Sequence, residues 1–217
     1  MEFKAAIFDL DGVIVDTAKY HYLAWKRLAA EKYGFEFSEQ DNERLKGVSR
    51  MRSLEILLEC GGITGVSEEE MQADATLKNE WYVEYISKID ESELLPGARE
   101  YLVWLHEQGI KTALGSASKN AGIILKNIGV TELFDAIIDG NCVSRAKPDP
   151  EVFLCGARAL GIDPANCIVF EDAEAGIEAA IAGGMKCVGI GDPARLNRAN
   201  AVIPGLFKAQ ELDTASF

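Results

Sequence analysis

The sequence has few histidines and no closely spaced cysteines. It contains two histidines and five cysteines, and no two cysteines form a Cys-x-x-Cys pair. An odd number of dispersed cysteines excludes a complete disulfide framework and supplies no zinc-binding motif. We therefore expect most cysteines to be buried small apolar residues. The five are Cys60, Cys142, Cys155, Cys167 and Cys187.

Basic residues and long apolar runs are also scarce. Lys and Arg number 22 against 35 Asp and Glu, which gives a formal charge of −13. Nucleic acids and anionic membranes bind basic faces, so neither is an expected partner. No apolar run approaches the roughly 20 residues of a membrane span, and the first residues lack a signal-peptide pattern. These features predict a cytoplasmic protein, and the acidic surface favours a monomer.

The chain begins with one strand and continues with helices alone. The apolar run 5–8 predicts a buried strand. Thr17 can cap a helix, and further helix starts follow at Ser38, Ser49 and Ser67 with no strand between them. About 75 consecutive residues therefore have helical patterns.

After Pro96-Gly97 the pattern alternates between helices and strands. The expected helices are 98–108, 119–128, 150–160 and 173–182, and the expected strands are 111–115, 136–139, 167–170 and 186–190. A short strand over 201–203 and a terminal helix over 206–212 would complete the chain. Alternation of this kind predicts a parallel sheet.

The fold class that follows is α/β, with a Rossmann-like parallel-sheet core and an inserted α-helical domain. The core domain would be discontinuous and comprise residues 1–15 and 92–217. The helical domain would comprise residues 16–91. A chain of 217 residues is long enough for one domain with a large insertion or for two compact units.

Two acids follow the first strand. A strand buried on both faces cannot hold Asp9 and Asp11 in its middle without a large desolvation cost, so they belong at its C-terminal end. If the extended backbone continues to residue 11, both carboxylates point the same way and Leu10 points into the packing. Such a pair suits Mg²⁺, which prefers carboxylate oxygens. The alternative is a solvated turn that contains two acids.

Polar residues also follow the other predicted strands. The segment 116–120 reads Ser-Ala-Ser-Lys-Asn and begins a helix whose backbone N–H groups can hold a phosphate. Lys147 lies before the next helix, and Glu171 and Asp172 follow another strand. Mg²⁺ and the ammonium of Lys147 would together offset the negative charge of the acids, so that a phosphate could enter. Phosphoryl transfer requires such a metal ion, ammonium and carboxylate in one site.

This ordered set of motifs resembles the haloacid dehalogenase-like (HAD) phosphotransferase superfamily. The motifs are Asp9-Leu10-Asp11-Gly12-Val13, Ser116, Lys147-Pro148 and Glu171-Asp172. The resemblance implies that Asp9 is the nucleophile, that Asp11 is the general acid/base, and that the helical insertion is a cap domain. It also implies that Mg²⁺ is held by Asp9, the Asp11 carbonyl, Glu171 and Asp172.

Further residues are similar to the β-phosphoglucomutase family within that superfamily. They are Thr17, His21, the stretch 45–50, Lys78 and the segment 116–120. That family interconverts β-D-glucose 1-phosphate and glucose 6-phosphate through β-glucose 1,6-bisphosphate. The resemblance therefore implies an isomerase of carbohydrate metabolism that acts on a small sugar phosphate and uses the bisphosphate as activator and intermediate.

The resemblance implies a role for each matching residue. Ser116, Ala117 and Lys147 would contact the transferring phosphate, and Arg50, Ser118, Lys119 and Asn120 would hold the distal one. Lys46, Gly47, Val48 and Lys78 would order sugar hydroxyls, and Ser49 belongs to the same substrate-binding stretch. Thr17 and His21 would assist catalysis, His21 by positioning Asp11.

Each of these assignments has an ordinary structural alternative. Lys46 and Arg50 lie in a basic stretch that could simply be solvated, and Lys78 lies on a charged helix that could face solvent. His21 could be a core or surface histidine, and Thr17 could serve only as a helix cap.

Two other functions compete with the mutase. The first is a sugar-phosphate phosphatase of the same superfamily, in which water attacks the aspartyl phosphate. The second is a catalytically silent protein that binds Mg²⁺ or phosphate for regulation. The intact pair Asp9 and Asp11 argues against the silent protein, and the stretch 47–50 favours the mutase over the phosphatase.

Overall fold

The computed structural model describes residues 3–45 and 48–213. The chain forms two compact units, which we call the core unit and the helical unit. The core unit comprises Met1–Asp16 and Ile89–Phe217, and the helical unit comprises Thr17–Lys88. Each unit is described separately below.

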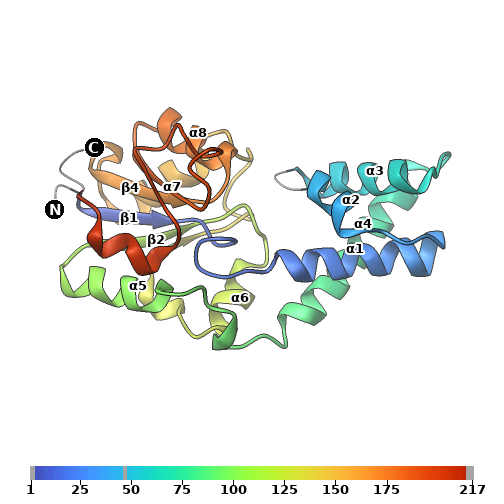
Figure 1. Cartoon of the computed structure of the whole chain (residues 1–217), viewed down its shortest axis with the longest axis horizontal. Helices are drawn as coiled ribbons and strands as arrows, with labels where there is room; N and C mark the ends of the chain where they lie inside the picture. Colours follow the sequence, from blue (N-terminus) through green and yellow to red (C-terminus); the bar gives the residue numbers. More distant parts are fainter. Residues whose placement is uncertain (1–2, 46–47, 214–217) are drawn as a thin grey trace. The chain divides into compact units, whose positions relative to one another are not determined.

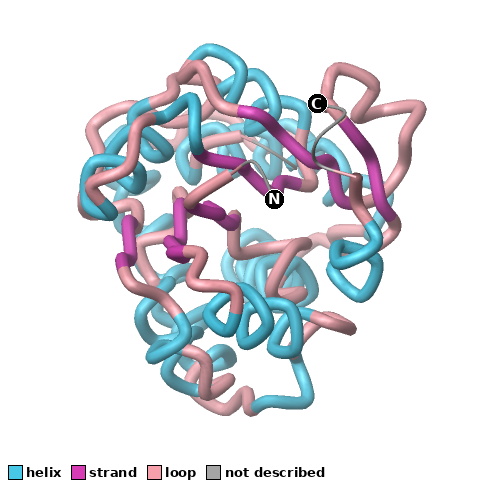
Figure 2. The backbone as a smooth tube through the Cα atoms, turned by 90° about the vertical axis from the view of Figure 1, so that its left-hand side faces the viewer, coloured by secondary structure: helices cyan, strands magenta, loops and turns pink. Residues whose placement is uncertain are grey.

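The core unit is built on a six-stranded parallel sheet, with the strand order β3-β2-β1-β4-β5-β6 (Figures 1 and 2). The strands are β1 (Ala5–Phe8), β2 (Lys111–Gly115), β3 (Ala136–Ile138), β4 (Cys167–Glu171), β5 (Lys186–Ile190) and β6 (Ala201–Ile203). The prediction of a parallel Rossmann-like sheet is confirmed.

β1 is the strand from which the chain builds the sheet first to one side and then to the other. From β1 the chain adds β2 and then β3 on one side, and β4 to β6 on the other. In register, Phe8 of β1 pairs with Leu114 of β2 and with Phe170 of β4. The carboxyl ends of these three strands therefore lie at one edge, at the switch point where open α/β sheets bind ligands.

Helices cover both faces of this sheet (Figure 1). The helices are α5 (Ala98–Glu107), α6 (Ala121–Asn127), α7 (Glu151–Leu160) and α8 (Glu174–Ala182), with short 3₁₀ segments η2 (Glu91–Glu93), η3 (Thr131–Leu133), η4 (Pro164–Asn166) and η5 (Leu206–Glu211). Residues of α7 and α8 share one apolar cluster with Ala5 and Ile7. The alternate residue Phe8 meets Tyr101 of α5 on the other face.

Aromatic packing stabilises the centre of the sheet. The rings of Phe8 and Phe170 stack with centroids 4.9 Å apart, and Tyr101 meets both rings edge to face. Phe8 and Phe170 have no exposed surface. Full burial of one such side chain contributes about 1.5–3 kcal/mol. The strands that end at the candidate site are thus fixed by the core beneath them.

The helical unit contains α1 (Ala18–Tyr33), α2 (Glu39–Asn42), η1 (Glu43–Leu45), α3 (Arg50–Gly61) and α4 (Glu68–Ile86). Ser38, Ser49 and Ser67 each accept an N-cap hydrogen bond at the predicted helix starts. The unit has its own apolar core, which includes Trp25 and Leu57. The predicted run of helices is confirmed.

One buried carboxylate links two helices of this unit. Asp74 of α4 is 1% exposed and accepts hydrogen bonds from the Lys32 ammonium and the Tyr33 hydroxyl. Both donors lie in the last turn of α1. A buried charge is tolerated where it is paired and hydrogen-bonded, so this arrangement fixes α1 against α4.

Two local features differ in detail from the sequence pattern. The Thr17 side chain does not cap α1. Its Oγ1 atom instead accepts a hydrogen bond of 3.2 Å from the Tyr82 hydroxyl. The terminal segment is the 3₁₀ helix η5, because its backbone closes shorter turns such as Lys208 N–H to Gly205 C=O.

The cysteines also differ from expectation. Only Cys167 and Cys187 are buried, whereas Cys60 and Cys155 are half-buried and Cys142 is exposed. All five are free thiols, as their spacing predicted.

The chain leaves and re-enters the core unit through a paired stem. Val15 and Leu94 form an antiparallel bridge, and the Leu95 N–H donates to the Ile14 carbonyl at 2.9 Å. The residues between these two short segments include the whole helical unit. Among residues 3–45 and 48–213, no helix combines the length and apolarity that a bilayer crossing demands.

Candidate active site

Three carboxylates meet at the carboxyl ends of β1 and β4. Asp9 follows β1 directly and its N–H donates to the Phe170 carbonyl at 2.9 Å, which fixes its backbone against β4. Glu171 ends β4, and Asp172 is the next residue. One carboxylate oxygen from each of Asp9, Glu171 and Asp172 lies within 4.8 Å of the others. The structure therefore brings together acids from two distant segments.

Lys147 lies between two of these acids. Its Nζ atom is 2.5 Å from Oδ1 of Asp9 and 2.8 Å from Oε2 of Glu171. The peptide bond between Lys147 and Pro148 is cis. Burial opposes the charged amine, but the adjacent carboxylates of Asp9 and Glu171 raise the pKa of Lys147 above its ordinary value. The residue is therefore a permanent ammonium at this site.

One ammonium does not balance three carboxylates. Burial, and then the neighbouring charge of Asp9, raises the pKa of Glu171, and the same two causes raise that of Asp172 to about 6. Hard oxygen donors that repel one another in a buried site suit a divalent cation, and Mg²⁺ typically takes such carboxylates. The donor set of Asp9, Glu171 and Asp172 therefore fits Mg²⁺.

Two glycines allow these acids to pack closely. A Cβ atom on Gly12 would lie 2.2 Å from Oδ2 of Asp172, and Gly12 has a φ of +77°. A Cβ atom on Gly176 would lie 2.0 Å from the carboxyl carbon of Glu171. A Cβ atom at either position would force the adjacent carboxylate to move, because real Cβ contacts are essentially never this short.

Asp11 lies in a turn rather than in a continued strand. The strand β1 ends at Phe8, and the Gly12 N–H donates to the Val15 carbonyl at 2.8 Å to close the turn. Leu10 is fully buried, as the alternation predicted, whereas Asp11 is half-buried. The common direction of the Asp9 and Asp11 carboxylates stays a prediction.

The segment after β2 folds into a polar loop at the same sheet edge. The Ser116 N–H donates to the Ile138 carbonyl at 3.0 Å, and Ser116 is buried. Its Oγ accepts the Ser118 N–H at 3.1 Å, and the Ser118 Oγ accepts the Asn120 N–H at 3.3 Å. These turns delay α6 to residue 121. Ala117 and Lys119, the other two members of the loop, are exposed.

A second polar cluster lies inside the helical unit. The Lys78 Nζ atom is 2.7 Å from Nδ1 of His21, and the His21 ring stacks on Tyr82 with centroids 3.8 Å apart. The ammonium also lies over the Trp25 ring, 4.6 Å from its centroid. Lys78 is 2% exposed, so the solvent-facing alternative for it is wrong.

Burial changes the protonation of this cluster. It lowers the pKa of Lys78 to about 7, and the charge of Arg50 lowers it further. Burial, then Lys78 and Arg50, lowers the pKa of His21 well below its ordinary value. His21 is therefore neutral near pH 7, and its Nδ1 accepts the hydrogen bond from Lys78.

The predicted substrate stretch of the helical unit is partly described. Arg50 is exposed, and its Nη2 donates to the Asn79 side-chain oxygen at 2.9 Å. Ser49 is the N-cap of α3, and Val48 is 39% exposed. Two other predicted residues, Lys46 and Gly47, lie outside the described residues.

Sequence reasoning missed the partners that hold these side chains. Trp25 and Tyr82 enclose Lys78, and Asn79 orients Arg50. A helical signal was available, because His21 and Trp25 are one turn apart on α1, as are Lys78 and Tyr82 on α4. Nothing in the local pattern shows that the two pairs face each other.

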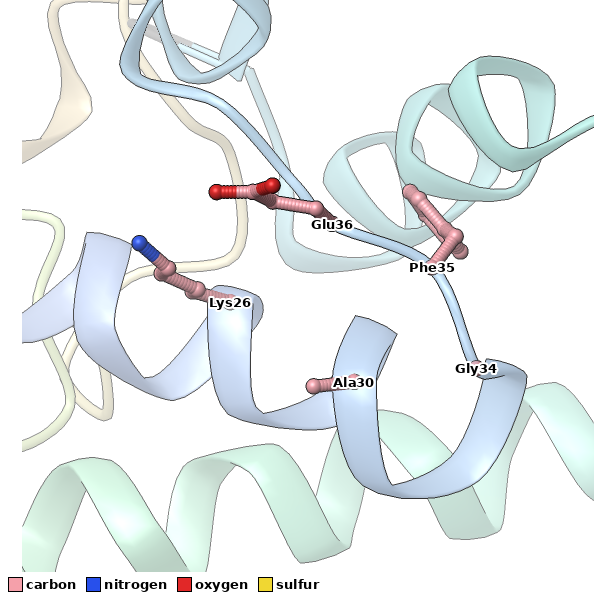
Figure 3. Close-up of a pocket in the computed structure, with 5 residues that line it drawn as sticks. All are labelled: Lys26, Ala30, Gly34, Phe35 and Glu36. Carbon is pink, nitrogen blue, oxygen red and sulfur yellow. The ribbon is translucent and has the colours of Figure 1, made fainter.

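A separate cavity of about 350 Å³ lies in the helical unit. It is lined by Lys26, Ala30, Gly34, Phe35 and Glu36, with the charged ends of Lys26 and Glu36 on one side (Figure 3). Among the described residues, none of the predicted site residues lines it.

Comparison with known proteins agrees with this geometry. The model of the haloacid dehalogenase-like hydrolase family matches residues 3–184. The chain belongs to that family. The resemblance inferred from the motifs is therefore confirmed, and the HAD family match covers both the acidic cluster and the helical insertion.

Individual HAD relatives narrow the comparison. The β-phosphoglucomutase of Bacillus subtilis is 45% identical over 92% of this chain and 88% of its own length. A crystal structure of β-phosphoglucomutase from Clostridium difficile matches with a TM-score of 0.86 and 43% identity, and covers 96% of both chains. A phosphatase of phosphorylated carbohydrates from Thermotoga maritima is 31% identical over 84% of this chain and 82% of its own.

Proposed function

We propose that this HAD enzyme is a β-phosphoglucomutase that interconverts β-D-glucose 1-phosphate and glucose 6-phosphate. The observation that carries the proposal is the buried contact of Lys147 with Asp9 and Glu171 at the switch point of the sheet. Identity of 45% to the Bacillus subtilis mutase supports the choice of reaction. The intermediate is β-glucose 1,6-bisphosphate, which also activates the enzyme.

The chemical step uses Asp9 as the nucleophile. A carboxylate oxygen of Asp9 attacks phosphorus of the bisphosphate, a P–O bond to Asp9 forms, and the P–O bond to the sugar oxygen breaks. The buried ammonium of Lys147 contacts Oδ1 of Asp9 and lies where negative charge gathers during transfer. Asp11 protonates the departing sugar oxygen and removes the proton when a sugar hydroxyl attacks in the second half-reaction.

The acids around Asp9 hold the cofactor. Asp9, the Asp11 carbonyl, Glu171 and Asp172 are the proposed ligands of Mg²⁺, which when bound offsets the charge of the carboxylates and of the transferring phosphate. Ser116 and Ala117 contact that phosphate. Gly12 and Gly176 keep the acids close enough to act together.

A bisphosphate requires a second anion site. We assign the distal phosphate to Arg50, Ser118, Lys119 and Asn120, and the sugar hydroxyls to Lys46, Gly47, Val48, Ser49 and Lys78. The planar guanidinium of Arg50, which Asn79 orients, can bind a phosphate through two parallel hydrogen bonds. Thr17 and His21 assist catalysis from the first turns of the helical unit. His21 holds Lys78, and we assign it the positioning of Asp11.

The helical unit acts as a cap domain that keeps water from the aspartyl phosphate. In a mutase the phosphoenzyme must wait for a sugar hydroxyl, so exclusion of water decides the reaction. The acidic composition, with a formal charge of −13, favours a cytoplasmic monomer. Light scattering after gel filtration measures the oligomeric state.

The second candidate is a sugar-phosphate phosphatase. The identity of 31% to the Thermotoga maritima phosphatase supports it, because the same catalytic core serves hydrolysis when water reaches the phosphoenzyme. The two functions differ in their product.

The deciding experiment measures that product. The protein is incubated with Mg²⁺, β-glucose 1-phosphate and a trace of β-glucose 1,6-bisphosphate, and both glucose 6-phosphate and inorganic phosphate are quantified. The mutase predicts glucose 6-phosphate as the main product. Inorganic phosphate as the main product would establish the phosphatase instead. Asp9→Asn should lower either activity by about 10⁴-fold or more.

Arg50 tests the second phosphate site. Arg50→Ala should raise KM for the sugar phosphate about 10- to 100-fold, because a bidentate contact to the distal phosphate is lost. Arg52→Ala is the matched control, since Arg52 is exposed and forms ion pairs with Glu55 and Glu59. Equal KM values for the two variants would remove Arg50 from the substrate site.

A further inference from the structure

Lys147 lies on a connection that has no regular secondary structure. The segment 139–150 joins β3 to α7, and no helix or strand of its own fixes the lysine. Its Nζ atom nevertheless lies within 2.8 Å of two carboxylates. Some other contact must therefore fix the backbone that carries it.

Glu151 makes that contact. It is the first residue of α7, and its carboxylate accepts the Arg145 N–H at 2.8 Å and the Ser144 N–H at 3.1 Å. The Ser144 hydroxyl donates to the same carboxylate at 3.0 Å. Three donors from the two residues 144 and 145 thus converge on one side chain, two to three residues before Lys147.

A second set of contacts closes the segment on its other side. The Glu151 N–H donates to Oδ1 of Asp149 at 3.0 Å, and Nη1 of Arg145 lies 3.0 Å from Oδ2 of Asp149. The Asp149 N–H donates to the Ala146 carbonyl at 3.0 Å. Lys147 therefore lies in a loop that Glu151 holds on both sides. Its carboxylate binds residues 144 and 145 before the lysine, and its N–H binds Asp149 after it.

The helix that carries Glu151 is itself fixed to the sheet. Val152 and Phe153 are buried in the core cluster that contains Ile7 and Val169. The Lys147 Nζ atom lies over the Phe153 ring, 4.6 Å from its centroid. The position of α7 is thus transmitted to the lysine through Glu151.

We propose that Glu151 is a positioning residue for phosphoryl transfer, because it fixes the loop that holds the Lys147 ammonium between Asp9 and Glu171. Among the described residues, no hydrogen bond or ion pair joins Glu151 to Asp9, Glu171 or Asp172. Its effect on the reaction passes through Lys147. The inference rests on the Asp9 phosphoryl transfer of the proposed function, and does not depend on which sugar accepts the group.

All three hydrogen bonds end on one carboxylate oxygen, Oε2 of Glu151. The same oxygen lies 3.5 Å from Nε of Arg145, so the negative charge also pairs with the guanidinium. Glu151→Gln keeps one acceptor oxygen but removes the charge, which weakens every hydrogen bond to the side chain. The hydrogen bond from the Arg145 N–H is also the first cause of the lowered pKa of Glu151, which keeps the group ionised.

The test follows transfer to Asp9 without a sugar. Acetyl phosphate is the phosphoryl donor: a P–O bond to Asp9 forms, the P–O bond to the acetyl group breaks, and acetate leaves with the bonding electrons. The rate of phosphoenzyme formation is measured in the full chain with Mg²⁺. Glu151→Gln should lower this rate about 10- to 100-fold. Glu178→Gln is the matched control, because Glu178 forms an exposed ion pair with Arg198 and should keep the normal rate.

A double-mutant cycle separates positioning from general damage to the fold. Lys147→Met should lower the rate more than Glu151→Gln, and the double variant should be no slower than Lys147→Met alone. If the fold-loss in rate of the double variant equals the product of the two single losses, the proposal is overturned. A normal rate for Glu151→Gln would also overturn it.

Glu151→Asp provides a second variant if the glutamine does not fold. It keeps the charge at a shorter reach, and its rate should lie between those of the wild type and Lys147→Met. Combined with Lys147→Met, Glu151→Asp should likewise give a rate no lower than that of Lys147→Met alone. Phosphoenzyme formation in Asp9→Asn would contradict the proposed function itself, which distinguishes that failure from a failure of the Glu151 assignment.

Discussion

The Nζ atom of Lys147 lies 2.5 Å from Oδ1 of Asp9, although the two residues are 138 positions apart in the chain. The same atom lies 2.8 Å from Oε2 of Glu171. One ammonium therefore serves carboxylates at the ends of two neighbouring central strands, and loss of that ammonium should be felt in both stability and rate.

Lys147→Met tests this relationship. It leaves Asp9 and Glu171 buried without a cation, so the free energy of unfolding should fall by about 3–5 kcal/mol without Mg²⁺. Phosphoenzyme formation should slow about 10²- to 10³-fold. Urea unfolding and acetyl phosphate kinetics measure the two effects. Lys208→Met removes an exposed pair with Glu211 and should cost less than about 1 kcal/mol. Equal losses in both variants would contradict the buried contact.

A comparison of two glycines tests the packing of the metal site. Gly12 and Gly62 have φ values of +77° and +64°, so alanine introduces similar backbone strain at both, about 1 kcal/mol. A Cβ atom at Gly12 collides with Asp172, whereas nothing lies within 4 Å of one at Gly62. Gly12→Ala should weaken Mg²⁺ binding at least about tenfold, as measured by calorimetry. Mg²⁺ affinity should be unchanged in Gly62→Ala.

Asp74 should matter for stability and not for chemistry. Asp74→Ala removes the buried acceptor of Lys32 and Tyr33, and should lower the free energy of unfolding by about 1–3 kcal/mol. Tyr33→Phe removes one of the two donors and should cost less. Thermal unfolding measures both variants. A loss in phosphoenzyme formation beyond the loss of folded protein would show that Asp74 also acts on the reaction.

Lys78 should titrate near neutral pH. Because its pKa falls to about 7 in the folded chain, the unfolded chain binds more protons than the folded chain between pH 7 and about 10. Stability from this group is therefore lowest below pH 7 and rises with pH through that window, by up to about 1.4 kcal/mol per unit. Carbon-13 NMR of the lysine Cε atoms measures the midpoint directly.

Lys78→Met provides the control for this titration. It should remove the shifted NMR signal and the rise of stability above pH 7, because His21 then has no buried ammonium beside it. A midpoint near 10 for the wild-type signal would contradict the lowering of the Lys78 pKa by burial and by the charge of Arg50.

The sheet could be predicted because its strands carry strong local signals. The expected strands 111–115 and 186–190 coincide with β2 and β5. The acids were placed correctly at the strand ends because burial excludes them from the strand interior. Helix ends were less certain from sequence. The pattern after Ser67 predicts a helix to about Ile89, but α4 stops at Ile86, where the Ser87 hydroxyl donates to the Val83 carbonyl.

Long-range partners could not be predicted from local pattern. Lys78 and His21 are 57 positions apart, and only the packing of α1 against α4 brings them together. Thr17 is a residue type that often caps helices. Its side chain instead accepts a hydrogen bond from the hydroxyl of Tyr82, which is 65 positions away in the chain. The role inferred for Glu151 likewise depends on contacts with Ser144 and Arg145 that no motif encodes.

The bridge between Val15 and Leu94 gives the core a closed junction at the point where the chain departs and returns. Because Val15 and Leu94 are already paired, the length of the segment inserted between them has little effect on the sheet. Exchange of residues 17–88 for the corresponding segment of a relative should leave aspartyl phosphorylation intact and transfer the relative's choice of acceptor. The choice of acceptor, set by the helical unit, and the phosphorylation of Asp9, set by the core unit, could thus change independently in evolution.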